Sequence, residues 1–165
     1  MIAVFPGSFD PVTLGHLDII NRVSGLFDKL VVAVMENALK KTTFSIQERL
    51  ALLNLTVKSL PNVEICEFSG LLTDFFLQSG FDVIIRGLRN AREYEHELQY
   101  AQAYKKINEK IETLFIPSAV EHVFISSSMV KEAAVFGGDL QLLLPDVIIN
   151  DVIKKLRGFP DGNDS

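Results

Sequence analysis

Residues 5–16, Phe-Pro-Gly-Ser-Phe-Asp-Pro-Val-Thr-Leu-Gly-His, place an imidazole and a hydroxyl on a stiffened turn. They follow the apolar run 2–5 and precede the amphipathic stretch 17–23, which predicts a loop from a first strand into a first helix. α/β folds bind nucleotides at such loops. At the start of a helix, unpaired N–H groups and the positive dipole end favour an anion. We therefore expect His16 and Ser8 to bind phosphate, whereas an isolated Gly-His pair would indicate only a capped turn.

Basic residues follow two further apolar runs. Residues 86–89, Arg-Gly-Leu-Arg, come directly after the run 83–85, and Lys40 and Lys41 follow the run 30–35. An arginine next to a buried strand is costly unless an anion or a carboxylate partners it. Guanidinium groups suit phosphate binding, and a structural ion pair with Asp or Glu is the alternative. A substrate phosphate could lie beside this lysine pair, whereas most lysine pairs belong to a solvated loop.

A second candidate anion site lies at residues 125–131, Ile-Ser-Ser-Ser-Met-Val-Lys. Three hydroxyls lie at a predicted helix start, and Lys131 lies about one turn into the helix. Free amides and hydroxyls at such a start could hold the β and γ phosphates of a nucleotide. A serine cap alone would explain one of these hydroxyls.

Acidic residues cluster around His96. Glu93, Glu95 and Glu97 could suggest a metal site or a pair for acid–base catalysis. Residues two apart on a helix point in different directions, so the spacing favours a charged helix face with His96 on the surface.

Apolar periodicity predicts the elements that would position these residues. Strands are expected at residues 2–5, 30–35, 63–68, 83–85 and 113–116, and helices at 15–26, 45–60, 71–79, 94–107, 127–136 and 145–156. Ser45 and Glu48 form a capping box. The alternation predicts a single-domain α/β fold, a doubly wound (Rossmann-like) five-stranded parallel sheet with flanking helices. We expect the domain to span residues 1–157 and residues 158–165 to form a tail.

Composition narrows the classes of partner. A net charge of −5 argues against broad nucleic-acid binding. No apolar run approaches the roughly 18 residues that would span a bilayer, so no membrane partner is expected. The apolar fraction of 48% is consistent with a buried sheet and a subunit interface. Cys66 is the only cysteine, which excludes an internal disulfide and is consistent with a cytoplasmic protein. The usual dinucleotide and P-loop glycine motifs are absent.

The motif at residues 5–16 resembles that of the nucleotidyltransferase superfamily. Thr13, Lys40-Lys41, the Arg-Gly-Leu-Arg block at 86–89 and the serine block at 125–131 are similar to the bacterial phosphopantetheine adenylyltransferases. The resemblance implies adenylyl transfer from ATP to 4′-phosphopantetheine, giving dephospho-coenzyme A and pyrophosphate. Because a phosphate monoester has its second pKa near about 6, no general base is required.

The resemblance also implies roles for individual residues. His16, Lys40 and Arg89 are expected to be catalytic, and Ser8, Lys40, Leu72 and Arg86 to bind the phosphopantetheine substrate. The resemblance leaves Lys41 on the surface. ATP would contact Ser8, Phe9, His16, Gly87, Leu88, Arg89, Glu97, His122, Val123, Phe124, Ile125, Ser126, Ser127 and Ser128. Mg²⁺ would be bound mainly through the ATP phosphates, with no metal ligand from the protein. A homohexamer and feedback by coenzyme A are further expectations.

Two alternatives remain open at this stage. One is another nucleotidyltransferase of the same fold, acting on nicotinamide or nicotinate mononucleotide or on a polyol phosphate. Thr13 and the block at 86–89 weigh against it. The other is a nucleotide-binding regulator without catalytic activity, which would bind ATP without releasing pyrophosphate.

Overall fold

The structure, a computed structural model, describes residues 1–36 and 41–158. Strands and helices alternate along these residues. In chain order the elements are β1 (Ile2–Gly7), α1 (Leu14–Ser24), β2 (Lys29–Glu36), α2 (Ile46–Val57), β3 (Val63–Ser69), α3 (Leu72–Ser79), β4 (Val83–Leu88), α4 (Ala91–Ile107), β5 (Thr113–Pro117), the 3₁₀ helix η1 (Val120–His122), α5 (Ser127–Val135), η2 (Asp146–Ile148) and α6 (Ile149–Arg157).

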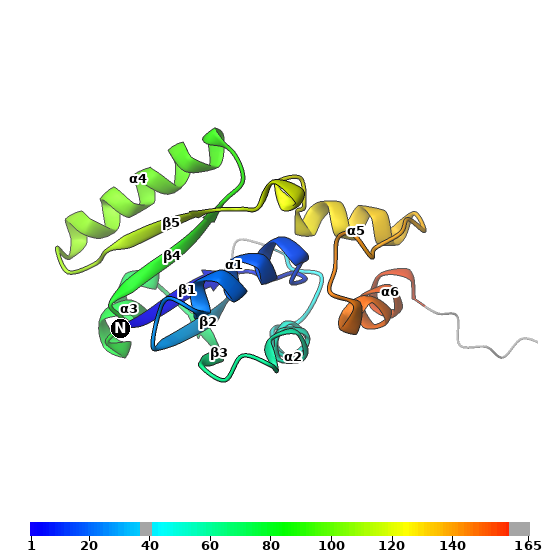
Figure 1. The fold of residues 1–165 in the computed structure, drawn as a ribbon, viewed down its shortest axis with the longest axis horizontal. Helices are drawn as coiled ribbons and strands as arrows, with labels where there is room; N and C mark the ends of the chain where they lie inside the picture. Colours follow the sequence, from blue (N-terminus) through cyan, green and yellow to red (C-terminus); the bar gives the residue numbers. More distant parts are fainter. Residues whose placement is uncertain (37–40, 159–165) are drawn as a thin grey trace, which may run out of the picture.

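The five strands form one parallel sheet in the order β3-β2-β1-β4-β5 (Figure 1). Val4 in the central strand β1 is in register with Val31 of β2 on one side and Ile84 of β4 on the other. The direction of winding reverses between β1 and β4, and ligands of such folds bind beyond the carboxyl ends of strands at this point. The predicted doubly wound, five-stranded α/β fold is confirmed.

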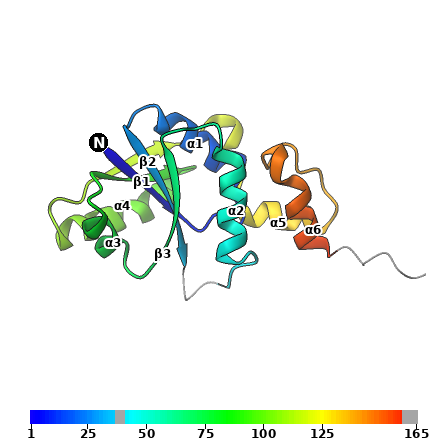
Figure 2. The same cartoon turned by 90° about the horizontal axis from the view of Figure 1, so that it is seen from below.

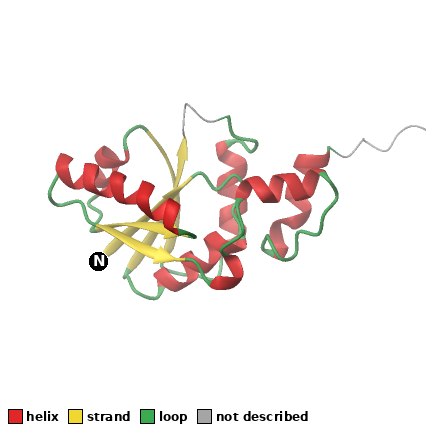
Figure 3. Ribbon diagram, turned by 90° about the horizontal axis from the view of Figure 1, so that it is seen from above, coloured by secondary structure: helices red, strands yellow, loops and turns green. Residues whose placement is uncertain are grey.

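Helices cover both faces of the sheet, because successive strand residues point to opposite sides. Ala3 and Phe5 pack in a buried cluster with side chains of α1 and α2. Val4 packs on the opposite face in a cluster with Leu72 and Phe76 of α3. Figures 2 and 3 show the resulting layers, with α1 and α2 on one side of the strands and α3 and α4 on the other.

The start of α2 follows the expected local rule. Ser45 Oγ accepts a hydrogen bond from the Glu48 amide at 3.2 Å, and the Glu48 carboxylate accepts one from the Ser45 amide at 2.7 Å. The predicted capping box is therefore present, and it fixes where the chain turns from the loop after β2 into the helix.

The end of β4 was predicted wrongly. The strand continues through Leu88, with Arg86 in register with Phe115 and Leu88 with Pro117 of β5. Backbone ladder bonds do not depend on the side chain, so an arginine and a glycine can extend a strand that its apolar run does not reveal. Residues 86–88 therefore form the carboxyl end of strand β4 and do not belong to the loop that follows it.

Helices α5 and α6 lie beside the sheet, next to each other and beyond α2 (Figures 1 and 2). Val130 and Ala134 of α5 and Val152 of α6 are buried in the cluster that contains Phe5. These helices thus share the main core, in line with a single domain. The predicted tail lies outside the described residues except for Gly158. No helix in the described chain is long and apolar enough to cross a membrane.

Candidate active site

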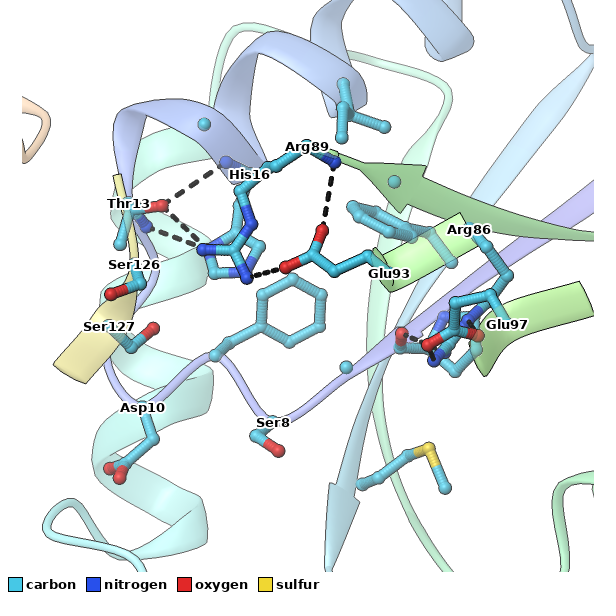
Figure 4. Close-up of a pocket in the computed structure, with 18 of the residues that line it drawn as sticks. Ser8, Asp10, Thr13, His16, Arg86, Arg89, Glu93, Glu97, Ser126 and Ser127 are labelled. Atoms are coloured by element: carbon cyan, nitrogen blue, oxygen red, sulfur yellow. Dashed lines mark hydrogen bonds and ion pairs between the residues drawn. The ribbon is translucent and has the colours of Figure 1, made fainter. Parts of the chain in front are cut away.

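A cavity of about 930 Å³ opens at the carboxyl edge of β1 and β4 (Figure 4). The loop after β1, the end of β4, α4 and the start of α5 all contribute side chains. Most of the residues singled out from the sequence line it, namely Ser8, Phe9, His16, Leu72, Arg86, Gly87, Arg89, Glu97, Ile125, Ser126, Ser127 and Ser128. The topology therefore brings four separate motifs to one place.

His16 is held in a defined tautomer by Thr13. The Thr13 amide donates to His16 Nδ1 at 3.1 Å, and the Thr13 hydroxyl lies 3.0 Å from the same nitrogen (Figure 4). Since Nδ1 accepts from the amide, the neutral ring carries its proton on Nε2. Burial, together with a smaller effect of the neighbouring Arg89, lowers the pKa of His16 to about 4. The ring is therefore a neutral hydrogen-bond donor at pH 7.

The Phe9 ring packs against the imidazole of His16. This phenyl ring is 1% exposed and packs edge-on against His16, with centroids 5.0 Å apart, and against Phe5 at 5.6 Å. The backbone of Phe9 has a φ of 47°, which is unfavourable for a residue with a side chain. The packing of the ring holds the turn in this strained form, as is common at binding loops.

Arg86 pairs with Glu97 of α4 within the cavity. Nε donates to Oε2 and Nη2 to Oε1, both at 2.6 Å, and Nη1 donates to the Pro6 carbonyl at 3.3 Å. The carboxylate partner that the sequence left open is thus present. Both side chains still line the cavity, so the guanidinium can exchange the carboxylate for a phosphate.

Arg89 is paired in a similar way with Glu93. The Glu93 carboxylate accepts from the Arg89 amide at 2.9 Å and contacts its Nη2, while Nη1 donates to the Ile125 carbonyl at 2.8 Å. Glu93 lines the cavity and was missed as a site residue. Its spacing of four from Arg89 is the signal that could have identified it. Arg89 also joins the end of β4 to the segment before α5.

Several polar groups at the start of α5 form hydrogen bonds or ion pairs within the protein. Ser126 Oγ accepts from the Met129 amide at 3.1 Å, and Ser127 Oγ donates to the Pro11 carbonyl at 2.8 Å. Lys131 donates to Asp10 at 2.8 Å. Of the groups expected to cradle an anion, the Ser126 and Ser127 hydroxyls and Lys131 thus already have partners within the protein. The amides of the first turn remain suited to an anion.

Asp10 connects three parts of the site. Its carboxylate accepts from the amides of Thr43 and Phe44, at 3.1 Å and 2.8 Å, as well as from Lys131. Asp10 is 6% exposed. It therefore fixes the loop after β1 against both the segment before α2 and helix α5.

The packing of α1 on β4 leaves no room for a Cβ at Gly87 unless Ile19 shifts. A Cβ at this position would lie 2.3 Å from Ile19 Cδ1, far inside contact distance. The absence of a side chain lets the end of the strand approach α1 and its N-terminal His16. Among the described residues, no group of three or more His, Cys, Asp and Glu side chains could hold a metal ion.

Comparison with known proteins identifies the family. A family model described as cytidylyltransferase-like matches residues 4–133. The phosphopantetheine adenylyltransferase of Clostridium tetani is 51% identical over 93% of this chain and 96% of its own. The chain belongs to the phosphopantetheine adenylyltransferase family. Another phosphopantetheine adenylyltransferase, from Caldanaerobacter subterraneus subsp. tengcongensis, is 46% identical over 94% of this chain and 98% of its own.

A solved structure shows the same fold at low identity. A Vibrio parahaemolyticus protein described as a nicotinate-nucleotide adenylyltransferase superposes with a TM-score of 0.67, covering 93% of this chain and 94% of its own. At 19% identity, this likeness concerns the fold alone. The similarity of fold agrees with the doubly wound parallel sheet of this chain.

Not every residue that was expected in the site can be assigned to the cavity. Lys40 is outside the described residues. Within the described chain, Leu88, His122, Val123 and Phe124 do not line the cavity. Lys41 and His96, both expected on the surface, are exposed and line the cavity as well.

Proposed function

We propose that the chain transfers AMP from ATP to 4′-phosphopantetheine, giving dephospho-coenzyme A and pyrophosphate in coenzyme A biosynthesis. The observation that carries the proposal is the convergence of His16, Arg86 and Arg89 on one cavity. Two phosphate-bearing substrates must meet for this reaction, and these donors suit both of them. Membership of the family supports the same pair of substrates.

The chemistry is an in-line displacement at phosphorus. A phosphate oxygen of 4′-phosphopantetheine attacks the α-phosphorus of ATP and forms a new P–O bond. The bond from this phosphorus to the oxygen that bridges to the β-phosphate breaks, and pyrophosphate leaves with the electron pair. The attacking monoester is largely dianionic at neutral pH because its second pKa is about 6. The protein therefore needs to position the anions and stabilise developing charge.

The geometry supports the catalytic and binding roles that the resemblance implies. His16 would donate its Nε2–H to the phosphate that gains charge in the transition state. Arg86 would leave Glu97 to bind the phosphate of phosphopantetheine, with Ser8 and Leu72 lining the same cavity. Arg89 would bind the nucleotide phosphates between the end of β4 and α5.

The remaining ATP contacts are proposed on the resemblance. Gly87, Glu97, Ile125 and Ser126 to Ser128 line the cavity, which supports their place near the nucleotide. Phe9 also lines the cavity, where its ring contacts His16. Leu88 and residues 122–124 are kept as ATP contacts because they are adjoining parts of the same chain segments. Lys40 is kept as a phosphate ligand for both substrates.

We infer that Mg²⁺ accompanies ATP. The carboxylates of Asp10, Glu93 and Glu97 in the cavity already contact cations, which supports binding of the metal mainly through phosphate oxygens. When bound there, Mg²⁺ would neutralise charge on the transferring and leaving phosphates.

Assembly and location extend the proposal. Tyr94, Ile107 and Leu114 on α4 and β5 expose 42%, 64% and 45% of their surface, which supports an interface between subunits of a homohexamer. A cytoplasmic location is proposed on the single cysteine, Cys66, and feedback by coenzyme A on the resemblance. Sedimentation analysis would test the number of subunits.

Pyrophosphate release tests the reaction directly. The protein is incubated with ATP and Mg²⁺, and with 4′-phosphopantetheine, nicotinate mononucleotide or glycerol phosphate in separate reactions. Glycerol phosphate is also tested with CTP. We expect release only with 4′-phosphopantetheine and a product with the mass of dephospho-coenzyme A. Turnover with another acceptor would replace the proposed substrate. ATP binding without turnover of any acceptor would favour a regulatory protein.

A further inference from the structure

Arg49 on α2 is a buried arginine with no carboxylate partner. Its side chain is 2% exposed, and the described chain shows no ion pair for it. Nη1 donates to the carbonyls of Ser8 at 2.8 Å and Met35 at 3.1 Å. Nε is buried and has no hydrogen-bond partner. Buried guanidinium groups are normally paired, so this one is uncompensated.

The guanidinium lies directly behind the wall of the cavity. Ser8 follows β1, and Met35 lies near the end of the neighbouring strand β2, whose Val34 is in register with Gly7. Both Ser8 and Met35 line the cavity, whereas Arg49 does not. Arg49 therefore joins two adjacent chain segments at the edge where phosphates are proposed to bind.

Three of the cations that line the cavity are neutralised. Arg86, Arg89 and Lys131 each contact a carboxylate. Arg49 instead has only carbonyl dipoles around its charge. An uncompensated cation close to an anion site raises the electrostatic potential there, and the low dielectric of the interior strengthens the effect.

We propose that Arg49 is a positioning residue for the substrate phosphates, acting through Ser8. Its bond to the Ser8 carbonyl turns that acceptor away from the cavity, so that the Ser8 hydroxyl and amide can face a phosphate. Its charge attracts the phosphate without touching it. This inference rests on the proposed function and adds a residue that the sequence motifs do not reveal.

Substitution of Arg49 separates charge from hydrogen bonding. Arg49→Met removes both, and Arg49→Lys keeps the charge on a side chain whose donors do not occupy the position of Nη1, which bonds both carbonyls. We expect Arg49→Met to weaken binding of 4′-phosphopantetheine and of inorganic pyrophosphate by about tenfold or more, measured by calorimetry. Arg49→Lys should recover part of this loss. Should Arg49→Met not fold, Arg49→Gln carries the same test.

A spectroscopic measurement distinguishes electrostatics from packing. The ³¹P resonance of bound 4′-phosphopantetheine is followed against pH in the absence of ATP. A nearby cation favours the dianion, so the phosphate should lose its second proton at a higher pH in Arg49→Met than in the wild type. The Lys variant should stay close to the wild type.

Two controls complete the test. Leu53→Ala removes a fully buried side chain of the same helix without changing charge, and Lys155→Met removes an exposed cation next to Glu48. Both should keep the wild-type affinity and ³¹P titration, whatever their melting temperatures. Unchanged pyrophosphate affinity and ³¹P titration in folded Arg49→Met would overturn the inference. Wild-type protein without turnover of 4′-phosphopantetheine would instead contradict the proposed function, while pyrophosphate binding would still test Arg49.

Discussion

Arg86 and Glu97 form a bidentate ion pair inside the cavity, with both N···O distances at 2.6 Å (Figure 4). Their side chains are 24% and 19% exposed, so water screens the pair only in part. An incoming phosphate must compete with this carboxylate for the guanidinium. The affinity for the phosphate is therefore set by a difference between two strong interactions rather than by Arg86 alone.

Glu97→Gln should release Arg86 for the substrate. We expect the dissociation constant for 4′-phosphopantetheine to fall by about threefold to tenfold, because a competing negative charge is removed. The Michaelis constant for ATP should rise, since Glu97 is proposed to contact the nucleotide. Calorimetry and steady-state kinetics measure the two effects separately. Glu95→Gln, an exposed change on the same helix, is the matched control. Weaker phosphopantetheine binding in Glu97→Gln would show that the carboxylate holds Arg86 in its productive position instead.

His16→Ala should reduce turnover far more than substrate binding. The Nε2–H is proposed to stabilise charge that develops only in the transition state, so kcat should fall by on the order of 10² or more. The Michaelis constant for ATP should change by much less. His16→Asn retains a side-chain donor and should recover part of the loss. Near-normal turnover of His16→Ala would remove the imidazole from the mechanism.

The pH dependence of stability should report the burial of His16. Its pKa is lowered from 6.5 to about 4 in the folded protein, chiefly by burial. Between these values the unfolded state binds more protons, so the free energy of unfolding should fall as the pH drops from 6.5 towards 4. Above pH 6.5 this contribution is fully present and constant.

Urea unfolding at about pH 7 and about pH 5 measures this effect. His16→Asn should lose this part of the pH dependence, and His96→Asn, an exposed change, should retain it. In the wild type, the ring proton resonances of His16 should begin to shift only below about pH 5. A midpoint near the ordinary histidine pKa would contradict the burial of the ring.

Much of this arrangement could be predicted from local patterns. The loop from β1 into α1, the capping box at Ser45 and the approach of Arg86 to the site depend on residues close together in sequence. Short-range rules of turn geometry, capping and strand burial describe them well. The convergence of the motifs then follows from parallel strands that share one carboxyl edge.

The partners of the charged residues could not be predicted in the same way. Arg86 and Glu97 are separated by the end of β4 and the first turns of α4, and no local spacing rule joins them. Arg49 has the sequence context of an ordinary helix residue after a capping box. Its burial depends on the meeting of two strand ends, Ser8 and Met35, which only the assembled sheet provides. Ion pairs and buried charges thus required the tertiary structure.

Gly87→Ala should destabilise the protein through a specific clash. The added methyl group would lie 2.3 Å from Ile19 Cδ1, whereas carbon atoms in contact prefer about 3.5–4 Å. We expect the free energy of unfolding to fall by about 1–3 kcal/mol, measured by urea denaturation. Gly25→Ala is the matched control, because its added methyl group would lie 3.8 Å from the Arg22 carbonyl oxygen, an ordinary contact distance.

A second substitution tests the cause of the loss in Gly87→Ala. Ile19→Val removes the Cδ1 atom and alone should cost about 1 kcal/mol. Combined with Gly87→Ala, it opens the space that the new methyl group needs, so the double variant should be more stable than the sum of the two single losses predicts. Strictly additive losses would show that Gly87 is needed for its backbone rather than for the approach of α1 to β4. Since α1 begins just before His16, recovery of stability in the double variant should be accompanied by recovery of kcat.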